Sequence, residues 1–217
     1  MTGVMRLIVG LIHSTRLVIE AVHNTISDLN NPFEIINLLD EGLLRCLKNK
    51  ENARIYQRMS EMVKKLQEDG ADLIIVTCSS LSPYVNELRT IAKVPIIKID
   101  EPMIEWAVIN HSKIGVVMTN PTTAEPTKNL IAEVARRLNK EVTVNSHLCA
   151  EAFNRLNQGD SKGHDDLVVD AVQSLLHEVD VVLLAQISIA RIIDRVDIKV
   201  RDRVLSSLDF IGSKIMG

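Results

Sequence analysis

A cysteine and two serines close a short apolar run in the segment IIVTCSSLSP, residues 74–83. A thiol that follows a buried strand and precedes a helix lies near backbone N–H groups and the positive end of the helix dipole, both of which favour its thiolate. Cys78 is therefore a candidate base or nucleophile, and Ser79 and Ser80 are candidates to cap the helix or to bind an anion. Alternatively, Cys78 is a small buried apolar residue and the serines only cap the helix.

Hydroxyl-bearing turns also follow two other apolar runs. The segment TNPTT, residues 119–123, places Thr119 and Thr122 between a predicted strand and a predicted helix, where hydroxyl and N–H groups can hold a carboxylate. His13 and Ser14 hold the same place after the first apolar run. Each turn can equally be a plain helix cap, and the residues alone leave both interpretations open.

Other polar and thiol residues are weaker candidates. The acidic pairs at residues 40–41 and 100–101 are interpreted first as solvated loop charges and second as a general base or an amine contact. Residues 163–166 (GHDD) are expected to be a loop leading into a helix, where acids suit the dipole. Cys46 and Cys149 are expected to be structural. Because the sequence has no glycine-rich nucleotide loop and no zinc-binding spacing, it predicts neither a nucleotide nor a metal cofactor.

Short apolar runs alternate with longer segments of helical period, which is typical of an α/β fold with parallel sheets. The predicted strands are residues 6–11, 34–38, 72–77, 95–99, 113–119, 141–145 and 180–185. The predicted helices are residues 52–68, 122–138, 165–178 and 202–214. Residues 102–110 are expected to connect two halves, and the last helix to return to the first half.

The order of these elements repeats along the chain. Three segments of the first half resemble three of the second: 6–10 with 113–117, 34–37 with 141–144, and 72–79 with 180–187. The first two pairs lie 107 residues apart and the third pair 108. Each match is weak alone, but three at nearly one offset indicate an internal duplication.

A duplication of this kind predicts two α/β halves whose strand ends face one cleft. In parallel sheets ligands bind beyond the carboxyl ends of the strands. We expect residues 1–103 with 203–217 to form the first half and residues 104–202 the second. Cys78 would then face Gln186 across the cleft. The turns expected to line it are residues 13–15, 77–80, 119–123 and 185–188.

Composition narrows the class of protein. The chain has 217 residues, 46% of them hydrophobic and 24% charged, with a net charge of −3, as in an ordinary soluble domain. Because aromatic residues make up only 3%, and the charge is not basic, we expect no nucleic-acid partner. The apolar run at residues 7–12 is too short to span a membrane. We expect a cytoplasmic homo-oligomer with free thiols and no membrane partner.

These features resemble the aspartate/glutamate/hydantoin racemase family over nearly the whole chain. The resemblance rests on the duplication, the strand–Cys–Ser–Ser turn at Cys78, GVVMTNPT at residues 115–122 and AFNRLNQGD at residues 152–160. It implies two pseudo-symmetric α/β halves around a cofactor-free site, in which turn hydroxyls and amides hold a carboxylate. It also implies two cysteines, one from each half, that remove and return the proton at the carbon next to that carboxylate.

The resemblance assigns roles to residues of both halves. Cys78 would be the first-half cysteine, with Ser79 and Ser80 in the carboxylate-binding turn. Thr119 and Thr122 would match the second-half threonines that help to hold the substrate. Such chemistry requires a thiolate of tuned pKa and positioned donors for an enolate-like transition state. The implied partner is a small carboxylate of amino-acid metabolism.

The second half departs from the family after its third strand. Where the family has Gly-Cys-Thr, this chain has Ala185-Gln186-Ile187, followed by Ser188. An amide can serve neither as an acid nor as a base. Gln186 and Ser188 can still donate hydrogen bonds to a carboxylate or an enolate, or Gln186 only satisfies nearby backbone groups.

Three functions remain open. We rank a cofactor-independent enzyme first, because the sequence keeps Cys78 and both hydroxyl-bearing turns. In the first, the chain is a racemase-like isomerase with Cys78 as thiolate base, and His13, Asp40 or another cysteine replaces the missing acid. In the second, it is a one-cysteine decarboxylase or cis–trans isomerase. The arylmalonate decarboxylase of this family keeps the second-half cysteine, whereas here the first remains. In the third, the chain binds a small carboxylate without catalysis.

Overall fold

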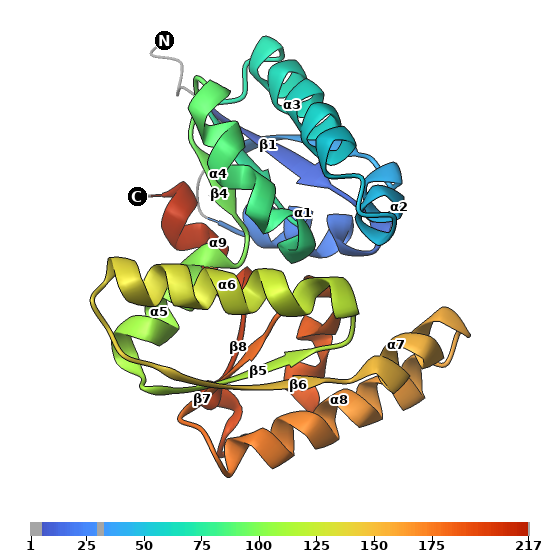
Figure 1. Cartoon of the computed structure of the whole chain (residues 1–217), viewed down its shortest axis with the longest axis vertical. Helices are drawn as coiled ribbons and strands as arrows, with labels where there is room; N and C mark the ends of the chain where they lie inside the picture. Colours follow the sequence, from blue (N-terminus) through green and yellow to red (C-terminus); the bar gives the residue numbers. More distant parts are fainter. Residues whose placement is uncertain (1–5, 30–32, 217) are drawn as a thin grey trace. The chain divides into compact units, whose positions relative to one another are not determined.

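The computed structural model describes residues 6–29 and 33–216, which form two α/β units, each built on a four-stranded parallel sheet (Figure 1). The first unit holds the described residues up to Ile99 and those from Ile211 onward, and the second is Asp100–Phe210. Helices cover both faces of each sheet, as expected for parallel strands that are buried on both sides. The predicted fold class is confirmed.

In the first unit, strands and helices alternate along the chain. In sheet order the strands are β2 (Phe33–Leu39), β1 (Leu7–His13), β3 (Leu73–Val76) and β4 (Ile96–Lys98). The helices are α1 (Ile19–Ser27), α2 (Gly42–Lys48), α3 (Asn52–Glu68) and α4 (Ser82–Ile91), and 3-10 turns η1 (Arg16–Val18) and η2 (Ser79–Leu81) precede α1 and α4. The two central strands, β1 and β3, are the most apolar, because they have neighbours on both sides.

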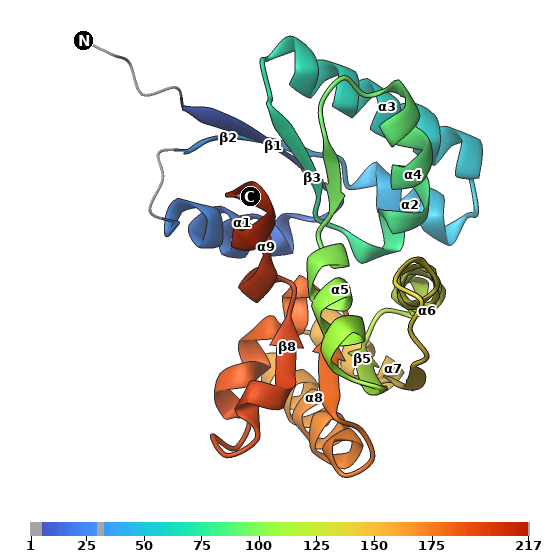
Figure 2. The same cartoon turned by 90° about the vertical axis from the view of Figure 1, so that its left-hand side faces the viewer.

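Helices α2, α3 and α4 pack on one face of this sheet, and α1 lies on the other (Figure 2). Apolar residues of α3 recur every three or four positions, from Ile55 to Leu66, and form one buried stripe. Gly10 in β1 leaves room for that stripe, because a Cβ on Gly10 would lie 2.9 Å from a methyl group of Leu66. A glycine at this place therefore allows α3 to approach β1 closely.

The second unit has the same alternation. In sheet order its strands are β6 (Thr143–Leu148), β5 (Lys113–Met118), β7 (Val181–Leu184) and β8 (Val204–Ser206). Its helices are α5 (Glu101–Asn110), α6 (Pro121–Arg137), α7 (Ala150–Asn157) and α8 (Ser161–Leu176), with 3-10 segments η3 (Ile187–Arg195) and η4 (Arg201–Arg203) between β7 and β8. The last helix, α9 (Leu208–Ile215), runs from this unit into the first.

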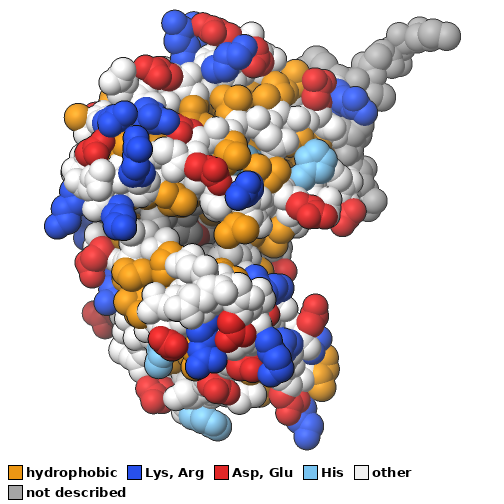
Figure 3. All heavy atoms as spheres, turned by 90° about the vertical axis from the view of Figure 1, so that its right-hand side faces the viewer, with side chains coloured by type: hydrophobic (Ala, Val, Ile, Leu, Met, Phe, Trp, Pro, Cys, Tyr) orange, Lys and Arg blue, Asp and Glu red, His pale blue; other side chains and the backbone are white. Residues whose placement is uncertain are grey.

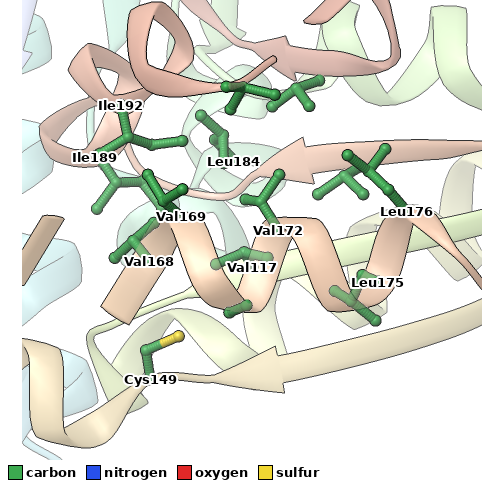
Figure 4. Close-up of a cluster of buried hydrophobic side chains, with 14 of the residues drawn as sticks. Val117, Cys149, Val168, Val169, Val172, Leu175, Leu176, Leu184, Ile189 and Ile192 are labelled. Carbon is green, nitrogen blue, oxygen red and sulfur yellow. The ribbon is translucent and has the colours of Figure 1, made fainter. Parts of the chain in front are cut away.

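Two apolar clusters hold the second sheet between its helices. One joins α8 and η3 to the sheet and includes Val168 and Val172 of α8, Val117 of β5 and Leu184 of β7 (Figure 4). The other covers the opposite face with side chains from α5 and α6. The sheet is thus fixed from both sides, which holds the ends of β5 and β7 in place.

The predicted duplication is confirmed in topology, with a different register. In the first unit β1 pairs with β3, and Ile12 lies opposite Val76. In the second unit β5 pairs with β7 in the same way, and Val117 lies opposite Leu184. Equivalent residues of the first strands, β1 and β5, lie 105 residues apart in the sequence (117 minus 12). Those of the second strands, β2 and β6, lie 109 apart (143 minus 34). The sequence matches predicted an offset of 107 for both. The third strands are related by 108, as predicted (184 minus 76).

Equivalent carboxylates pin the start of each central strand pair. Asp72 accepts a hydrogen bond from the N–H of Ile8 at 2.9 Å, and Asp180 accepts one from the N–H of Lys113 at 2.8 Å. The N–H of Lys113 lowers the pKa of the Asp180 carboxyl, because a donor stabilises the charged form. The aspartate that opens both copies of the third repeat segment therefore has one structural role.

The end of the chain differs from the predicted helix 202–214. Val204–Ser206 is a strand that pairs with β7, and α9 begins only at Leu208. This pairing extends the second unit to Phe210, beyond the boundary expected at residue 202. The end of α9 belongs to the first unit, as expected, where Gly212 lies against Leu29.

The start of α8 also differs from its prediction. The helix was expected from residue 165 but begins at Ser161, because Asp160 caps it by accepting a hydrogen bond from the N–H of Gly163 at 2.8 Å. The GHDD segment therefore lies inside the first turns of α8 and is not a loop.

No described helix is long and apolar enough to cross a membrane. On the face drawn in Figure 3, basic and acidic side chains are interspersed. That face therefore offers no single basic surface of the kind that binds a polyanion.

We expect Asp72→Ala and Asp180→Ala each to lower the free energy of unfolding by about 1 kcal/mol, because each removes a hydrogen bond that ties two central strands. Urea unfolding measures the change, and Asp170→Ala, which removes an exposed carboxylate of α8, is the control. Because the folded-state pKa of Asp180 is lowered, its contribution is present above the ordinary carboxyl pKa and is lost as the pH falls below it. Equal stability of all four proteins would contradict this role.

Candidate active site

Cys78 lies where β3 ends, in extended backbone that leads into η2. Its side chain is partly buried and packs against the core of the first unit. Four donors favour its thiolate: the hydroxyl of Ser14, the N–H groups of Ser80 and Leu81, and the hydroxyl of Ser80. Ser79 and Ser80 are both buried in this turn. The sequence analysis placed the thiol and its turn correctly at a strand end.

Burial nevertheless raises the pKa of the Cys78 thiol, and its effect outweighs that of the four donors. The expectation of a lowered pKa is therefore wrong, because the turn removes water from the sulfur more than it stabilises the negative charge. Burial thus favours the neutral thiol of Cys78 over its thiolate.

Ser14 is the residue that follows β1, and it is 1% exposed. Its Oγ has no hydrogen-bond partner among the described residues. A buried hydroxyl without a partner is costly, so such a group marks a place where an acceptor is missing. The acceptor that fits is either a thiolate at Cys78 or an oxygen atom of a ligand.

His13 joins the ends of three strands. Its Nε2 lies 2.9 Å from Oδ1 of Asn37 in β2, and its Nδ1 lies 2.8 Å from Oγ1 of Thr77, which follows β3. The Asn37 oxygen only accepts, so Nε2 carries a hydrogen, while the one hydrogen of the Thr77 hydroxyl is shared between Nδ1 of His13 and the carbonyl of Ile12, 3.0 Å away. Burial lowers the pKa of His13, although the hydrogen bond to Asn37 opposes it. Both ring nitrogens are thus engaged within the protein, and the ring is neutral.

Asp40, another candidate acid, is held by a two-pronged ion pair with Arg58 of α3. It also accepts a hydrogen bond from the N–H of Gly42 at 2.9 Å. The Arg58 guanidinium holds the pKa of Asp40 below its usual range. The carboxylate is therefore charged and paired, which is unsuited to proton donation.

In the second unit, Gln186 fills the place of Cys78. Both residues are extended, follow the third strand by two positions and lead into a 3-10 segment. Oε1 of Gln186 accepts hydrogen bonds from the N–H of Thr119 at 2.7 Å, the N–H of Asn120 at 3.0 Å and Oγ1 of Thr119 at 3.2 Å. We call these three donors the β5 cradle. Thr119 is equivalent to Ser14, because each follows its strand by the same number of residues.

The two other predicted site residues of this unit have local partners. Asn120 caps α6, and its Oδ1 accepts both the N–H of Thr122 at 3.0 Å and the hydroxyl of Thr122 at 2.9 Å. Ser188 is partly exposed in η3, and its carbonyl accepts a hydrogen bond from Arg191 at 2.6 Å. The cap interpretation of the 119–123 turn therefore holds for Thr122, whereas Thr119 contributes to the β5 cradle.

Cys46, Cys149 and His164 are also buried. Cys149 belongs to the apolar cluster under α8, and burial raises its pKa to about 11. Cys46 is buried in α2. His164 is fully buried in α8, with Nδ1 2.7 Å from Oδ1 of Asp165. Asp165 in turn pairs with Arg191 at 2.7 Å.

The sequence analysis placed Thr77 and Asn120 in the turns expected to line the cleft but gave neither a role, and it did not name Leu81. The role of Asn120 could have been found, because an asparagine before a proline is a typical start of a helix. That of Thr77 could not, because its contact with His13 depends on the pairing of β1 with β3. Nor does any sequence pattern reveal the N–H of Leu81, since a backbone donor is available from every residue type but proline.

Neither a group of metal-ligating side chains nor the groove along α3 indicates another functional centre among the described residues. Among the residues that the structure describes, no three His, Cys, Asp or Glu side chains come together to hold a metal ion. A groove of about 840 Å³ runs along α3 from Tyr56 to Glu68, beside Ile91. It contains no residue of the strand-end turns, so the chemistry of the candidate site lies elsewhere.

Comparison with known protein families shows which family the chain belongs to. The family model described as Asp/Glu/Hydantoin racemase matches residues 12–211. The chain belongs to this family. The resemblance found in the sequence is thereby confirmed, while no curated protein matches the chain.

Solved structures of racemases share the fold at low identity. Aspartate racemase from Picrophilus torridus is similar with a TM-score of 0.75 and 14% identity, over 97% of this chain and 93% of that chain. Allantoin racemase from Klebsiella pneumoniae has a TM-score of 0.72 and 15% identity, over 97% of this chain and 86% of that chain. Glutamate racemase isoform RacE1 from Bacillus anthracis has a TM-score of 0.73 and 17% identity, over 97% of this chain and 80% of that chain. At these identities the likeness shows the racemase fold alone.

We expect Cys78 to be alkylated by iodoacetamide with a midpoint above the value of about 8.5 of a free thiol, because burial raises its pKa. Ser14→Ala should move the midpoint further up, since it removes a donor to the thiolate. The matched control is Ser27→Ala, which removes an exposed hydroxyl at the end of α1. Mass spectrometry of the labelled peptide separates Cys78 from Cys46 and Cys149. A Cys78 midpoint below 8.5 would contradict the burial argument.

Proposed function

We propose that this racemase-family chain is a cofactor-independent isomerase that acts at the carbon next to the carboxylate of a small amino acid or related acid, with Cys78 as the thiolate base. The observation that carries the proposal is the set of donors around Cys78, which includes the otherwise unpartnered hydroxyl of Ser14. Family membership supports an enzyme of racemase type. The thiolate takes the proton from the α-carbon and leaves an enolate. Return of the proton by the same thiol regenerates the starting enantiomer, so inversion requires a second proton donor, such as a water molecule, on the opposite face of the enolate.

The other strand-end residues are proposed to bind the substrate carboxylate. Donors suited to this are the hydroxyl and amide groups of Ser14, Ser79, Ser80, Gln186 and Ser188. Thr119 and Thr122 are proposed to act by positioning Gln186 and Asn120, because those residues accept their hydrogen bonds. His13 is proposed to act by holding the ends of three strands, because both of its ring nitrogens already have protein partners. That strand ends of both units contribute to one site stays a prediction, as do the homo-oligomer and the cytoplasmic location.

A second candidate is a one-cysteine decarboxylase, and the raised pKa of Cys78 favours it. A carboxylate leaves the substrate as carbon dioxide, its bonding electrons remain on the α-carbon, and a neutral thiol at Cys78 protonates that carbon. Gln186 cannot supply a second proton. The two candidates differ in the form of Cys78 that they require: the thiolate for the isomerase and the thiol for the decarboxylase.

Incubation in deuterated water with amino acids, 2-hydroxy acids and substituted malonates should give α-deuterated acid from the wild type. We expect Cys78→Ala to lower this exchange by roughly 100-fold or more, which is the usual contribution of a general base. Mass spectrometry and proton NMR measure the label, and Cys46→Ala is the matched control because that cysteine lies away from the strand-end turn. Full turnover by Cys78→Ala would rule out the proposed mechanism.

The pH profile of kcat/KM separates the two candidates. For the isomerase we expect kcat/KM to rise with pH and level off above the pKa of Cys78, because the thiolate is the active form. For the decarboxylase it should fall over the same range. A 2-hydroxy acid and a substituted malonate are suitable substrates, since neither carries an amine that titrates there. A profile that is flat between pH 7 and about 10 would contradict the isomerase, because the proportion of thiolate rises with pH below the pKa of Cys78.

Gln186→Cys should create a second thiol at the position equivalent to Cys78. If the two strand ends share one site, this variant should produce both enantiomers from either one, as measured by chiral chromatography. Leu184→Cys, within the buried strand β7, is the control for a cysteine elsewhere in the same segment. Product confined to one enantiomer, in a folded variant that still exchanges the α-proton, would contradict the two-cysteine arrangement.

A further inference from the structure

Gln186 has an amide whose orientation is set by the protein. Two of its three partners in the β5 cradle are backbone N–H groups, which can only donate. The atom that receives them must be the amide oxygen, so the Nε2 group points to the other side of the carboxamide. The orientation follows from hydrogen-bond chemistry.

The β5 cradle is itself rigid. Thr119 is 1% exposed and directly follows β5, which is the second strand in the sheet and has neighbours on both sides. Asn120 is the cap of α6, a helix of 17 residues, and is tied to the N–H of Thr122. An amide held by three donors on such a frame loses little further freedom when it binds a ligand.

The Nε2 group is left without a partner within the protein. No described residue accepts a hydrogen bond from it, and Gln186 is only partly buried. Two N–H donors are therefore fixed in direction and free to contact a ligand. Because they only donate, they select an acceptor such as a carboxylate or enolate oxygen and give no support to an ammonium group.

The first unit shows why glutamine differs from cysteine here. The equivalent pair is Ser14 and Cys78, where the shorter side chain offers the Ser14 hydroxyl only a thiol and no oxygen acceptor. In the second unit the longer side chain of Gln186 reaches the cradle and satisfies it. The same frame thus holds a titratable thiol in one unit and an anchored amide donor in the other.

We propose that Gln186 is a substrate-binding residue whose Nε2 donates to a carboxylate or enolate oxygen, while its Oε1 stays in the β5 cradle. This inference rests on the proposed function, because it requires the substrate to reach the end of β7. In this proposal, position 186 binds negative charge and does not carry a second proton-transfer group. The unit then contributes binding, and Cys78 alone contributes proton transfer.

Gln186→Glu is the sharpest test, because it keeps an oxygen for the β5 cradle and replaces the donor by a second, negatively charged acceptor. We expect it to fold as well as the wild type and to bind a carboxylate roughly tenfold or more weakly, since a hydrogen bond to a charged group is lost. Gln186→Met, of similar length, lacks both the acceptor and the donor and should lose melting temperature as well as affinity. Circular dichroism melts report the first effect.

Binding is measured separately from turnover, in the Cys78→Ser background, by calorimetric titration with methylmalonate, aspartate and a 2-hydroxy acid. The control ligand is the neutral diamide of methylmalonic acid. Gln186→Glu should weaken binding of the acid far more than that of the diamide. In the protein with Cys78 intact, KM should rise more than kcat falls.

The outcomes separate this inference from the proposed function. Cys78-dependent exchange with unchanged KM and affinity in a folded Gln186→Glu protein would overturn the role of Gln186 and leave the isomerase standing. Carboxylate binding that weakens in Gln186→Glu, in a protein without exchange activity, would support the role of Gln186 and overturn the isomerase. If Gln186→Glu does not fold, unchanged affinity in a folded Gln186→Met protein overturns the proposal. A wild type that binds none of the three acids overturns it too.

Discussion

Backbone N–H groups at the point where a buried parallel strand becomes a helix are the constraint on which both units depend. There the sheet no longer supplies carbonyl partners, and the helix has none for its first donors. Each such turn must find an acceptor or keep its donors for a ligand. In the second unit Gln186 supplies the acceptor from inside the chain. In the first unit a thiol is surrounded instead by the Ser14 hydroxyl, which is equivalent to that of Thr119, and by donors of its own turn, from Ser80 and Leu81.

The duplication makes this difference interpretable. Both units share strand order, a glycine at the same place in the first strand (Gly10 and Gly115), and an aspartate that ties the starts of the central strands. Against such a common frame, the exchange of cysteine for glutamine stands out as a chemical change and not as a change of fold. A side chain longer by two heavy atoms is enough to fill one turn and leave the other incomplete.

Burial and hydrogen bonding act against each other at Cys78. The same turn that offers donors to the thiolate also removes water from the sulfur, and desolvation has the larger effect on its pKa. The balance is sensitive, because a ligand or a substitution that changes either water or donors shifts the proportion of thiolate. Under the proposed function, this balance decides whether Cys78 acts as a base or as an acid.

The sequence alone determined the alternation of strands and helices, the duplication, the family and the strand-end positions of Cys78 and Gln186, because these depend on local pattern and order. It missed β8, since Val204–Ser206 is too short to stand out from the helical pattern around it. Only the tertiary structure decided the true register between the repeats, the ion pair that occupies Asp40 and the pKa direction of Cys78. These depend on strand pairing and burial, which join residues far apart in the chain. The hydrogen bonds of Gln186 are of the same kind, because they link positions 66 and 67 residues apart.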